Sequence, residues 1–274
     1  MAELISVIVA TYNREDALDA VLRSLAAQTD RDFEIVIADD GSGPAVRQCV
    51  TRWAARMTVS LRHVWHEDRG FRAAEARNRA ILESRGAYCV FLDADCLARP
   101  NFVARHRALA EHGWFVTGNR VLLSPNLTAQ VLREGQEAER WSFANWASQR
   151  LRGGINRLSA LLHLPLGPFR RLRSTQWEGA RSCNLAVWRA DLDAVDGFDA
   201  DYVGWGKEDS DIIVRLLRAG IRRKDGNFAT GVLHLWHPEA DRSALPENER
   251  KLGAIVAGGE IRARRGLSRL AALP

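Results

Sequence analysis

Polar clusters at the ends of four successive predicted strands constrain the fold of this chain more than any other feature. In the N-terminal part, short apolar runs rich in β-branched residues alternate with segments whose apolar residues recur at helical spacing. The predicted strands cover residues 4–10, 33–38, 58–65 and 87–92. They are followed in turn by Thr11-Tyr12-Asn13, Asp39-Asp40, His66-Glu67-Asp68 and Asp93-Ala94-Asp95. This alternation predicts a mostly parallel, doubly wound α/β sheet whose strand ends share one ligand-binding edge.

The rest of the chain is less regular until its last third. We expect a helix over Ala129–Gln149 and a basic surface tail over Ile261–Pro274. Alternation returns with predicted strands at Cys183–Trp188 and Ala229–Trp236 and a helix at Asp209–Ala219. We find no internal repeat and no low-complexity linker, so we expect one structural domain.

Composition excludes several classes of protein. The longest apolar stretches of the 274 residues, near Ile5–Ala10 and Ile35–Ala38, are far shorter than the ~20 residues that span a bilayer. The N-terminus lacks the basic start and apolar centre of a signal peptide, so we expect a cytoplasmic protein. A net charge of +5 is weak evidence for nucleic-acid binding, and we expect none. The four cysteines form no C-x-x-C pair, which argues against zinc and disulfide scaffolds.

Asp93 and Asp95 are candidate metal ligands. Two carboxylates one residue apart at a strand end can share a divalent cation, and oxygen ligands suit Mg²⁺ or Mn²⁺. His234 and His237 follow another apolar strand, and an imidazole ligand would favour Mn²⁺ over Mg²⁺. The alternatives are a solvated acidic turn for the aspartates and structural roles for the histidines.

The segment Gly204-Trp205-Gly206-Lys207-Glu208-Asp209 is a second candidate site. A tryptophan face can stack on the apolar face of a sugar ring, and a nearby carboxylate can act as general base on a hydroxyl. Acidic residues also stabilise a first helical turn through the helix dipole, which is the alternative role for Ser210 and Asp211.

A third group of residues is suited to a nucleotide. Asp40 can accept a hydrogen bond from the N3–H of uracil, and Tyr12 can stack on that base, although an Asx turn also explains Asp40. Around a predicted helix start lie Arg69, Arg72, Arg77 and Asn78, which form either an anion site or a solvated helix face.

Taken together, these motifs resemble glycosyltransferase family two with the GT-A fold. The opening SVIVATYNRED…EIVIADDGS is similar to the nucleotide-binding start of that family, and DRGFRAAEARNRAI…VFLDADC resembles its central segment and D-x-D motif. VDGFDADYVGWGKEDSDIIVRLLRAG resembles the carboxyl half shared by chondroitin-type polymerases and β-1,4-galactosyltransferases. The resemblance covers about residues 4–120 and 177–240.

The resemblance implies a role for each matching residue. Ala10, Tyr12 and Asp40 would hold the base, Arg77 would lie near the diphosphate, and Asp93 would touch the ribose or the metal shell. The implied metal ligands are Asp95, His237 and, less securely, His234, for Mn²⁺ (or Mg²⁺). Asp209 matches the catalytic base and Glu208 its acceptor-binding neighbour, while Gly204, Trp205 and Gly206 would position sugars.

The resemblance implies an inverting, metal-dependent transfer from a nucleotide-sugar, expected to be UDP-linked, to a glycan hydroxyl in bacterial surface polysaccharide or lipopolysaccharide synthesis. We expect residues 1–118 to bind the donor and residues 119–240 to bind the acceptor and catalyse the transfer. The second region would contain a basic insertion at about 141–176, and residues 241–274 would form a helical tail. A nucleotidyltransferase or a dinucleotide-dependent enzyme would need a glycine-rich loop after the first strand, which Thr11-Tyr12-Asn13-Arg14 is not. A non-catalytic glycan-binding or scaffold protein remains an alternative, although Asp95 and Asp209 are both present.

The stretch Arg150–Arg173 contains several arginines and no acidic residue. Together with the apolar, proline-broken Leu158–Phe169, it suggests either contact with an anionic membrane at the inner face, where a lipid-linked glycan acceptor would lie, or an ordinary packing subdomain with exposed arginines.

Overall fold

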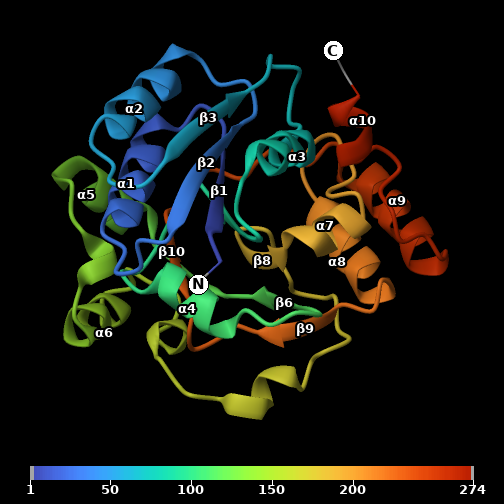
Figure 1. Cartoon of the computed structure of the whole chain (residues 1–274). Helices are drawn as coiled ribbons and strands as arrows, with labels where there is room; N and C mark the ends of the chain where they lie inside the picture. Colours follow the sequence, from blue (N-terminus) through green and yellow to red (C-terminus); the bar gives the residue numbers. More distant parts are fainter. Residues whose placement is uncertain (1–2, 273–274) are drawn as a thin grey trace.

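A computed structural model describes residues 3–272, which are built around a seven-stranded sheet of order β3-β2-β1-β4-β8-β6-β9 (Figure 1). Its strands are β1 (Ile5–Thr11), β2 (Phe33–Asp39), β3 (Leu61–Trp65), β4 (Tyr88–Asp93), β6 (Trp114–Thr117), β8 (Asn184–Trp188) and β9 (Arg222–Asp225). Strand β8 runs antiparallel to both of its neighbours, and every other pairing in this sheet is parallel. The predicted mostly parallel α/β sheet is confirmed.

Helices cover both faces of this sheet. The helices that pack on one face are α1 (Glu15–Ala26), α2 (Pro44–Ala54) and α5 (Pro125–Glu134). Those on the other face are α3 (Ala73–Glu83), α7 (Arg189–Ala194), α8 (Glu208–Arg218) and α10 (Leu267–Ala271). Because both faces are covered, β1 and β2 are apolar along nearly their whole length. The remaining α-helices are α4 (Phe102–Leu109), α6 (Phe143–Leu151) and α9 (Leu245–Ala257).

A smaller, three-stranded sheet joins segments that are far apart in the sequence. It has the order β5-β10-β7, with β5 at Cys96–Leu97, β10 at Val232–His234 and β7 at Arg120–Leu122. His234 pairs with Cys96, and the Leu235 amide donates to the Asp95 carbonyl at 2.8 Å. The loop after β4 is thereby fixed against the segment that begins at His234.

The helix expected over Ala129–Gln149 is wrong, because two helices share this region. Helix α5 ends at Gly135, whose φ of +61° is left-handed, and the Gln136 amide then donates to the Val131 carbonyl at 3.0 Å. Helix α6 begins anew after Ser142, whose hydroxyl accepts from the Asn145 amide at 3.2 Å. The apolar residues keep their helical spacing across this break, so their pattern did not predict it, and Gly135 ends the first helix.

The surface tail expected over Ile261–Pro274 is also wrong for its described part, 261–272. Leu267 and Leu270 of α10 are buried, as is Ala263, and Leu267 packs in the core beneath α3. The Ser268 amide donates to Asp196 at 2.8 Å, which fixes the short helix to the loop after α7. Residues 273–274 lie outside the described part.

Within residues 3–272, no helix is both long enough and apolar enough to cross a bilayer.

A fully buried ion pair fixes helix α8, which carries the predicted catalytic residues. Asp211 and Arg215 lie one turn apart, and Arg215 Nε donates to the Asp211 carboxylate at 2.8 Å. Arg215 also donates to the carbonyls of Val195 and Gly197 at 2.7 and 2.9 Å. Helix α8 is thereby attached to the loop that follows α7.

Replacing Arg215 should therefore destabilise the protein strongly. In Arg215→Met, the Asp211 carboxylate and two carbonyls lose their buried donor, which should cost about 3–5 kcal/mol of the free energy of unfolding. Urea unfolding followed by circular dichroism measures this. Arg218→Met is the control on the same helix, because its contacts are exposed and should be worth less than about 1 kcal/mol. Equal losses in the two variants would contradict this account of α8.

Candidate active site

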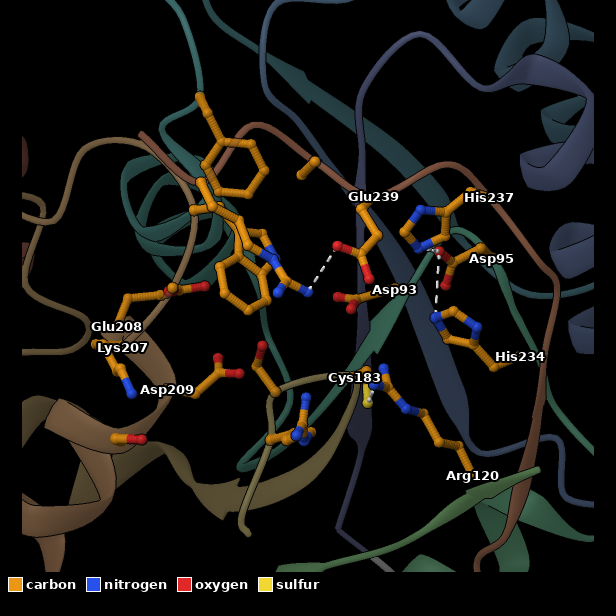
Figure 2. Close-up of a pocket in the computed structure, with 18 of the residues that line it drawn as sticks. Asp93, Asp95, Arg120, Cys183, Lys207, Glu208, Asp209, His234, His237 and Glu239 are labelled. Carbon is orange, nitrogen blue, oxygen red and sulfur yellow. Dashed lines mark hydrogen bonds and ion pairs between the residues drawn. The ribbon is translucent and has the colours of Figure 1, made fainter. Parts of the chain in front are cut away.

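A cavity of about 650 Å³ lies at the end of β4, between the start of α8 and the segment after β10 (Figure 2). Of the residues selected from sequence, those that line it are Arg77, Asp93, Asp95, Trp205, Gly206, Glu208, Asp209, His234 and His237. These residues come from distant parts of the chain, and the fold brings them together in the wall of one cavity. The cavity is large enough for a sugar and part of its carrier.

Asp95, His234 and His237 form one cluster in this wall (Figure 2). Their potential ligand atoms all lie within 4.8 Å of one another. The Oδ2 atom of Asp95 is 3.3 Å from His237 Nε2 and 3.6 Å from His234 Nε2. This spacing follows from the pairing of β10 with β5 described above.

The protonation of the histidines fits a metal site. His237 Nδ1 lies 2.7 Å from the Pro238 carbonyl, which can only accept, so this nitrogen carries a proton and Nε2 is the ring nitrogen that faces Asp95. Burial lowers the pKa of His234, which favours its neutral, ligating form. One carboxylate and two imidazoles suit Mn²⁺ better than Mg²⁺, which prefers oxygen ligands alone.

Arg77 connects the two halves of the site. Its buried guanidinium donates to Asp93 at 3.0 Å and to Glu208 at 3.3 Å. It also lies over the Phe198 ring, 5.5 Å from the centroid. From the resemblance we expect Arg77 near the diphosphate. In the structure its guanidinium is hydrogen-bonded to two carboxylates, Asp93 and Glu208.

Glu208 and Asp209 open helix α8 at the cavity. Burial raises the pKa of Glu208 to about 7, the neighbouring Asp209 adds to the rise, and Arg77 opposes it. Burial likewise raises the pKa of Asp93 to about 6, against the effect of Arg77. Among the described residues, Asp209 Oδ1 is buried and has no hydrogen-bond partner. A carboxylate oxygen in that state is free to accept a proton from a bound molecule.

Left-handed backbone shapes the loop before α8. The φ angles of Gly204, Gly206 and Lys207 are +77°, +103° and +77°. A Cβ atom on Gly204 would meet the Ala244 Cβ at 2.4 Å, so this glycine allows the segment before α9 to pack closely. Trp205 lines the cavity, and the Arg242 guanidinium lies over its ring at 4.8 Å.

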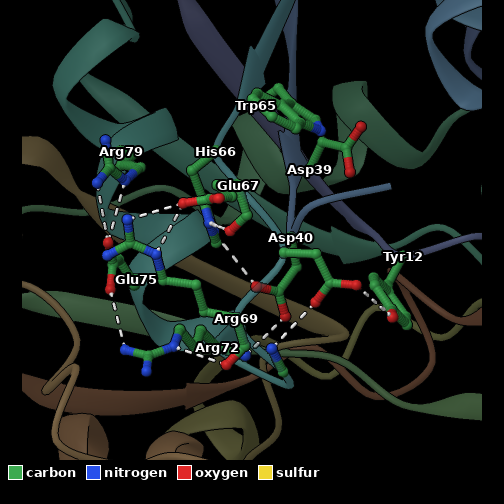
Figure 3. Close-up of polar contacts among 12 residues, drawn as sticks. Tyr12, Asp39, Asp40, Trp65, His66, Glu67, Arg69, Arg72, Glu75 and Arg79 are labelled. Atoms are coloured by element: carbon green, nitrogen blue, oxygen red, sulfur yellow. Dashed lines mark hydrogen bonds and ion pairs between the residues drawn. The ribbon is translucent and has the colours of Figure 1, made fainter. Parts of the chain in front are cut away.

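Tyr12 and Asp40 lie outside this cavity, at the neighbouring strand ends (Figure 3). Tyr12 is 44% exposed, and its hydroxyl donates to Asp68 at 3.0 Å. Asp40 is buried, accepts from the Arg72 amide at 2.7 Å and lies 3.2 Å from His66 Nε2. This contact with Asp40 raises the pKa of His66. Together, the exposed Tyr12 ring and the Asp40 carboxylate form a surface, called the platform below, on which a planar group could stack and make a hydrogen bond.

Backbone hydrogen bonds connect that platform to the cavity. The Ala10 carbonyl accepts from the Ala94 amide at 2.8 Å, so the end of β1 is fixed to the loop that carries Asp95. The Gly204 amide donates to the Phe71 carbonyl at 2.9 Å, which joins the loop after β3 to the loop before α8.

Sequence reasoning missed several residues that line the cavity. They are Phe71, Arg120, Arg181, Cys183, Trp236, Glu239 and Arg242. Arg120 comes from β7 and Glu239 from the loop after β10, where no motif or spacing marked them. Trp236 adjoins His237, and that proximity is the signal that could have found it, while Lys207 lies in the selected segment 204–209 without a predicted role.

Comparisons with known proteins agree on one class. The profile of "Glycosyl transferase family 2" matches residues 6–158, and that of "N-terminal domain of galactosyltransferase" matches residues 171–237. A validoxylamine A glucosyltransferase from Streptomyces hygroscopicus subsp. limoneus is 31% identical over 235 residues. That match covers 80% of this chain and 49% of the relative, so the chain spans about half the length of this relative.

Two solved structures share the fold. S. aureus TarS 1–349 in complex with UDP superposes with a TM-score of 0.63 and 17% identity, over 96% of this chain and 67% of that one. A mannosyltransferase from Pyrobaculum calidifontis in complex with GDP-Man and Mn²⁺ superposes with a TM-score of 0.62 and 20% identity, over 94% and 64%.

Removing the buried guanidinium should make stability depend more strongly on pH. In Arg77→Met, Asp93 and Glu208 lose the cation that lowers their pKa, so both pKa values in the folded protein rise further above the ~4 of an unfolded chain. The folded state then binds more protons than the unfolded state, and stability falls as pH rises. We expect a loss of about 3–5 kcal/mol at pH 8 and a smaller loss at pH 5, measured by urea unfolding.

The control is Arg79→Met on the same helix, because Arg79 pairs with Glu75 at 2.9 Å nearer the surface. It should cost less than about 1 kcal/mol at either pH. A loss in Arg77→Met that does not change between pH 5 and pH 8 would refute the role of Arg77 as the partner of two ionised carboxylates.

Proposed function

The chain belongs to glycosyltransferase family 2 and has the GT-A fold, and from this we propose that it transfers a sugar from a nucleotide-sugar to an acceptor hydroxyl with inversion at the anomeric carbon. One observation carries the proposal. The same cavity is lined by a carboxylate–imidazole cluster and by Asp209, whose Oδ1 is buried and has no hydrogen-bond partner within residues 3–272. The first suits a diphosphate-bound cation and the second suits general-base catalysis.

The proposed donor is a UDP-sugar, with the base between Tyr12 and Asp40 near Ala10. Tyr12 is exposed for stacking, and Asp40 is held by the Arg72 amide and by His66 so that a carboxylate oxygen can accept from the uracil N3–H. The likeness to a structure with bound UDP supports this choice. Asp93 would face the ribose or the metal shell, since it lies between Arg77 and the metal cluster.

We propose Asp95, His237 and His234 as ligands of a divalent metal, Mn²⁺ in preference to Mg²⁺. When bound, such a cation neutralises the diphosphate and stabilises it as a leaving group. The Mn²⁺ in the mannosyltransferase structure supports the assignment. The β10–β5 pairing positions these candidate ligands next to one another.

In the proposed reaction, the acceptor hydroxyl lies beside Asp209. The Asp209 carboxylate takes the proton as the acceptor oxygen forms its bond to the anomeric carbon, and the bond from that carbon to the diphosphate oxygen breaks. Glu208 would hold another acceptor hydroxyl, and Trp205, between Gly204 and Gly206, would stack on a sugar ring. Cavity closure around the two sugars would exclude water from the reacting atoms.

We propose that residues 1–118 bind the donor, that 119–240 bind the acceptor and supply the base, and that 241–274 form a helical tail. The acceptor would be a glycan or lipid-linked glycan of bacterial surface polysaccharide or lipopolysaccharide synthesis, extended in the cytoplasm. The support is the position of the galactosyltransferase-type match, residues 171–237, in the half that contains Asp209.

Asp209→Asn should abolish most of the activity while leaving donor binding intact. The amide keeps the shape of the side chain but cannot take the proton, so turnover should fall by about 10²–10⁴-fold. UDP release from UDP-sugars with a panel of glycan acceptors measures turnover, and calorimetry measures UDP affinity. Asp201→Asn is a control in the nearby loop outside the cavity lining and should keep normal turnover. Near-normal turnover in Asp209→Asn would exclude Asp209 as the base.

Nucleotide binding should depend on the metal cluster. We expect UDP with Mn²⁺ to raise the melting temperature more than UDP with EDTA, and more than GDP, CMP or dTDP. At about 100 times Kd the stabilisation would be about 2.7 kcal/mol. In Asp95→Ala the Mn²⁺-dependent part of the shift should disappear. An equal shift with Mn²⁺ and with EDTA would contradict the metal assignment, and no shift with any nucleotide would contradict the proposed function.

A further inference from the structure

The segment between α6 and β8 exposes apolar side chains that nothing in the described structure covers. Phe169 is 67% exposed, Leu172 is 79% exposed and Leu164 is 41% exposed. Phe169 and Leu172 are three residues apart in and just after a 3₁₀ turn, Gly167–Arg171, so their side chains project from the same side. In Figure 1 this segment (yellow) runs along the lower edge of the molecule, below β9.

Hydrogen bonds hold this exposed segment rigidly. The buried Arg170 donates to the carbonyls of Asp225 and Asn227 at 2.8 and 2.7 Å. The Leu164 amide donates to the Phe228 carbonyl at 3.0 Å, and the Ser174 carbonyl accepts from the Arg223 amide at 2.9 Å. The segment is thus attached to β9 and the following turn at three points. The backbone that carries the exposed apolar side chains is therefore held in place by hydrogen bonds.

The charged residues within this part of the sequence are of one sign. No aspartate or glutamate occurs between Trp141 and Trp177, whereas six arginines do: Arg150, Arg152, Arg157, Arg170, Arg171 and Arg173. Within residues 3–272, Arg171 is the one member of this set that has a carboxylate partner, Glu111 at 2.8 Å, and Lys224 shares that glutamate. Net positive charge therefore remains around the exposed apolar residues.

We propose that Leu164, Phe169 and Leu172, flanked by Arg171 and Arg173, form a docking surface for an anionic lipid bilayer. The apolar side chains would enter the boundary between headgroups and acyl chains, and the arginines would contact lipid phosphates. Two signals that peripheral membrane binding requires are present: a few apolar residues, and net positive charge, since Arg171 shares one carboxylate with Lys224 and Arg173 has no carboxylate partner among the described residues. A protein partner would be expected to meet a more balanced mixture of charges.

The same segment leads directly into the active site. After Trp177 the chain continues through Gly179, Arg181 and Cys183, which line the cavity. Docking through Leu172 would thus act on a segment that enters the cavity lining seven residues later, at Gly179. Docking on a membrane would bring a membrane-bound acceptor to the cavity only if the proposed function is correct. The docking itself does not depend on the proposed function.

Co-sedimentation with vesicles tests the proposal. We expect the full chain to bind vesicles of phosphatidylcholine with 30–40% phosphatidylglycerol and to bind pure phosphatidylcholine at least about 10-fold more weakly. Binding to the anionic vesicles should fall about 100-fold in Phe169→Ser/Leu172→Ser and should weaken in 0.5 M NaCl. The matched control is Val256→Ser/Ile261→Ser, which changes two exposed apolar residues on and after α9 and should bind like the unchanged chain.

The outcomes separate this proposal from the proposed function. The Mn²⁺-dependent UDP shift should be the same in Phe169→Ser/Leu172→Ser and in the unchanged chain, which also shows that the variant is folded. No binding to anionic vesicles, or equal binding by the variant, would overturn the docking surface even if UDP binds. A third outcome is that the unchanged chain does not bind vesicles but self-associates, and that Phe169→Ser/Leu172→Ser abolishes the self-association. This outcome would assign the surface to contact with a second copy of the chain.

Discussion

A buried guanidinium between two carboxylates determines how the active site of this protein is built. Arg77 bonds Asp93 at the end of β4 and Glu208 at the start of α8, so it joins the D-x-D loop to the helix that presents Asp209. Buried like charges repel one another unless a cation lies between them. With Arg77 in place, Asp93 and Glu208 can both lie buried in the cavity lining, where burial raises their pKa values to about 6 and about 7.

The sequence predicted the N-terminal strands of the fold well because their signals are local. Each strand ends in polar residues, and parallel strands bring their ends to one edge, so Asp40 and Asp93 follow from spacing alone. The confirmed family came from the order of these motifs. The position of each site residue is now described, while its role remains a prediction that the experiments above address.

What the sequence could not predict depends on pairing between distant segments. The spacing of Asp95 from His234 and His237 is set by the β10–β5 pairing, and only the resemblance indicated it. Arg120 and Glu239 reach the cavity through that small sheet and the loop after it, which no local pattern marked. Gly135 broke a helix whose apolar spacing continued across it, because one left-handed residue outweighs periodicity.

The small sheet also sets an order of assembly during synthesis. The platform formed by Tyr12 and Asp40 needs only strands that emerge early from the ribosome, up to β4. The Asp95–His234–His237 cluster takes one residue from that early part and two from residues 234 and 237. Because the long loop between them must close before β5 and β10 can pair, the nascent chain would expose Asp95 without its neighbours until residue 237 has been synthesised. The two candidate sites would thus form at different times during synthesis.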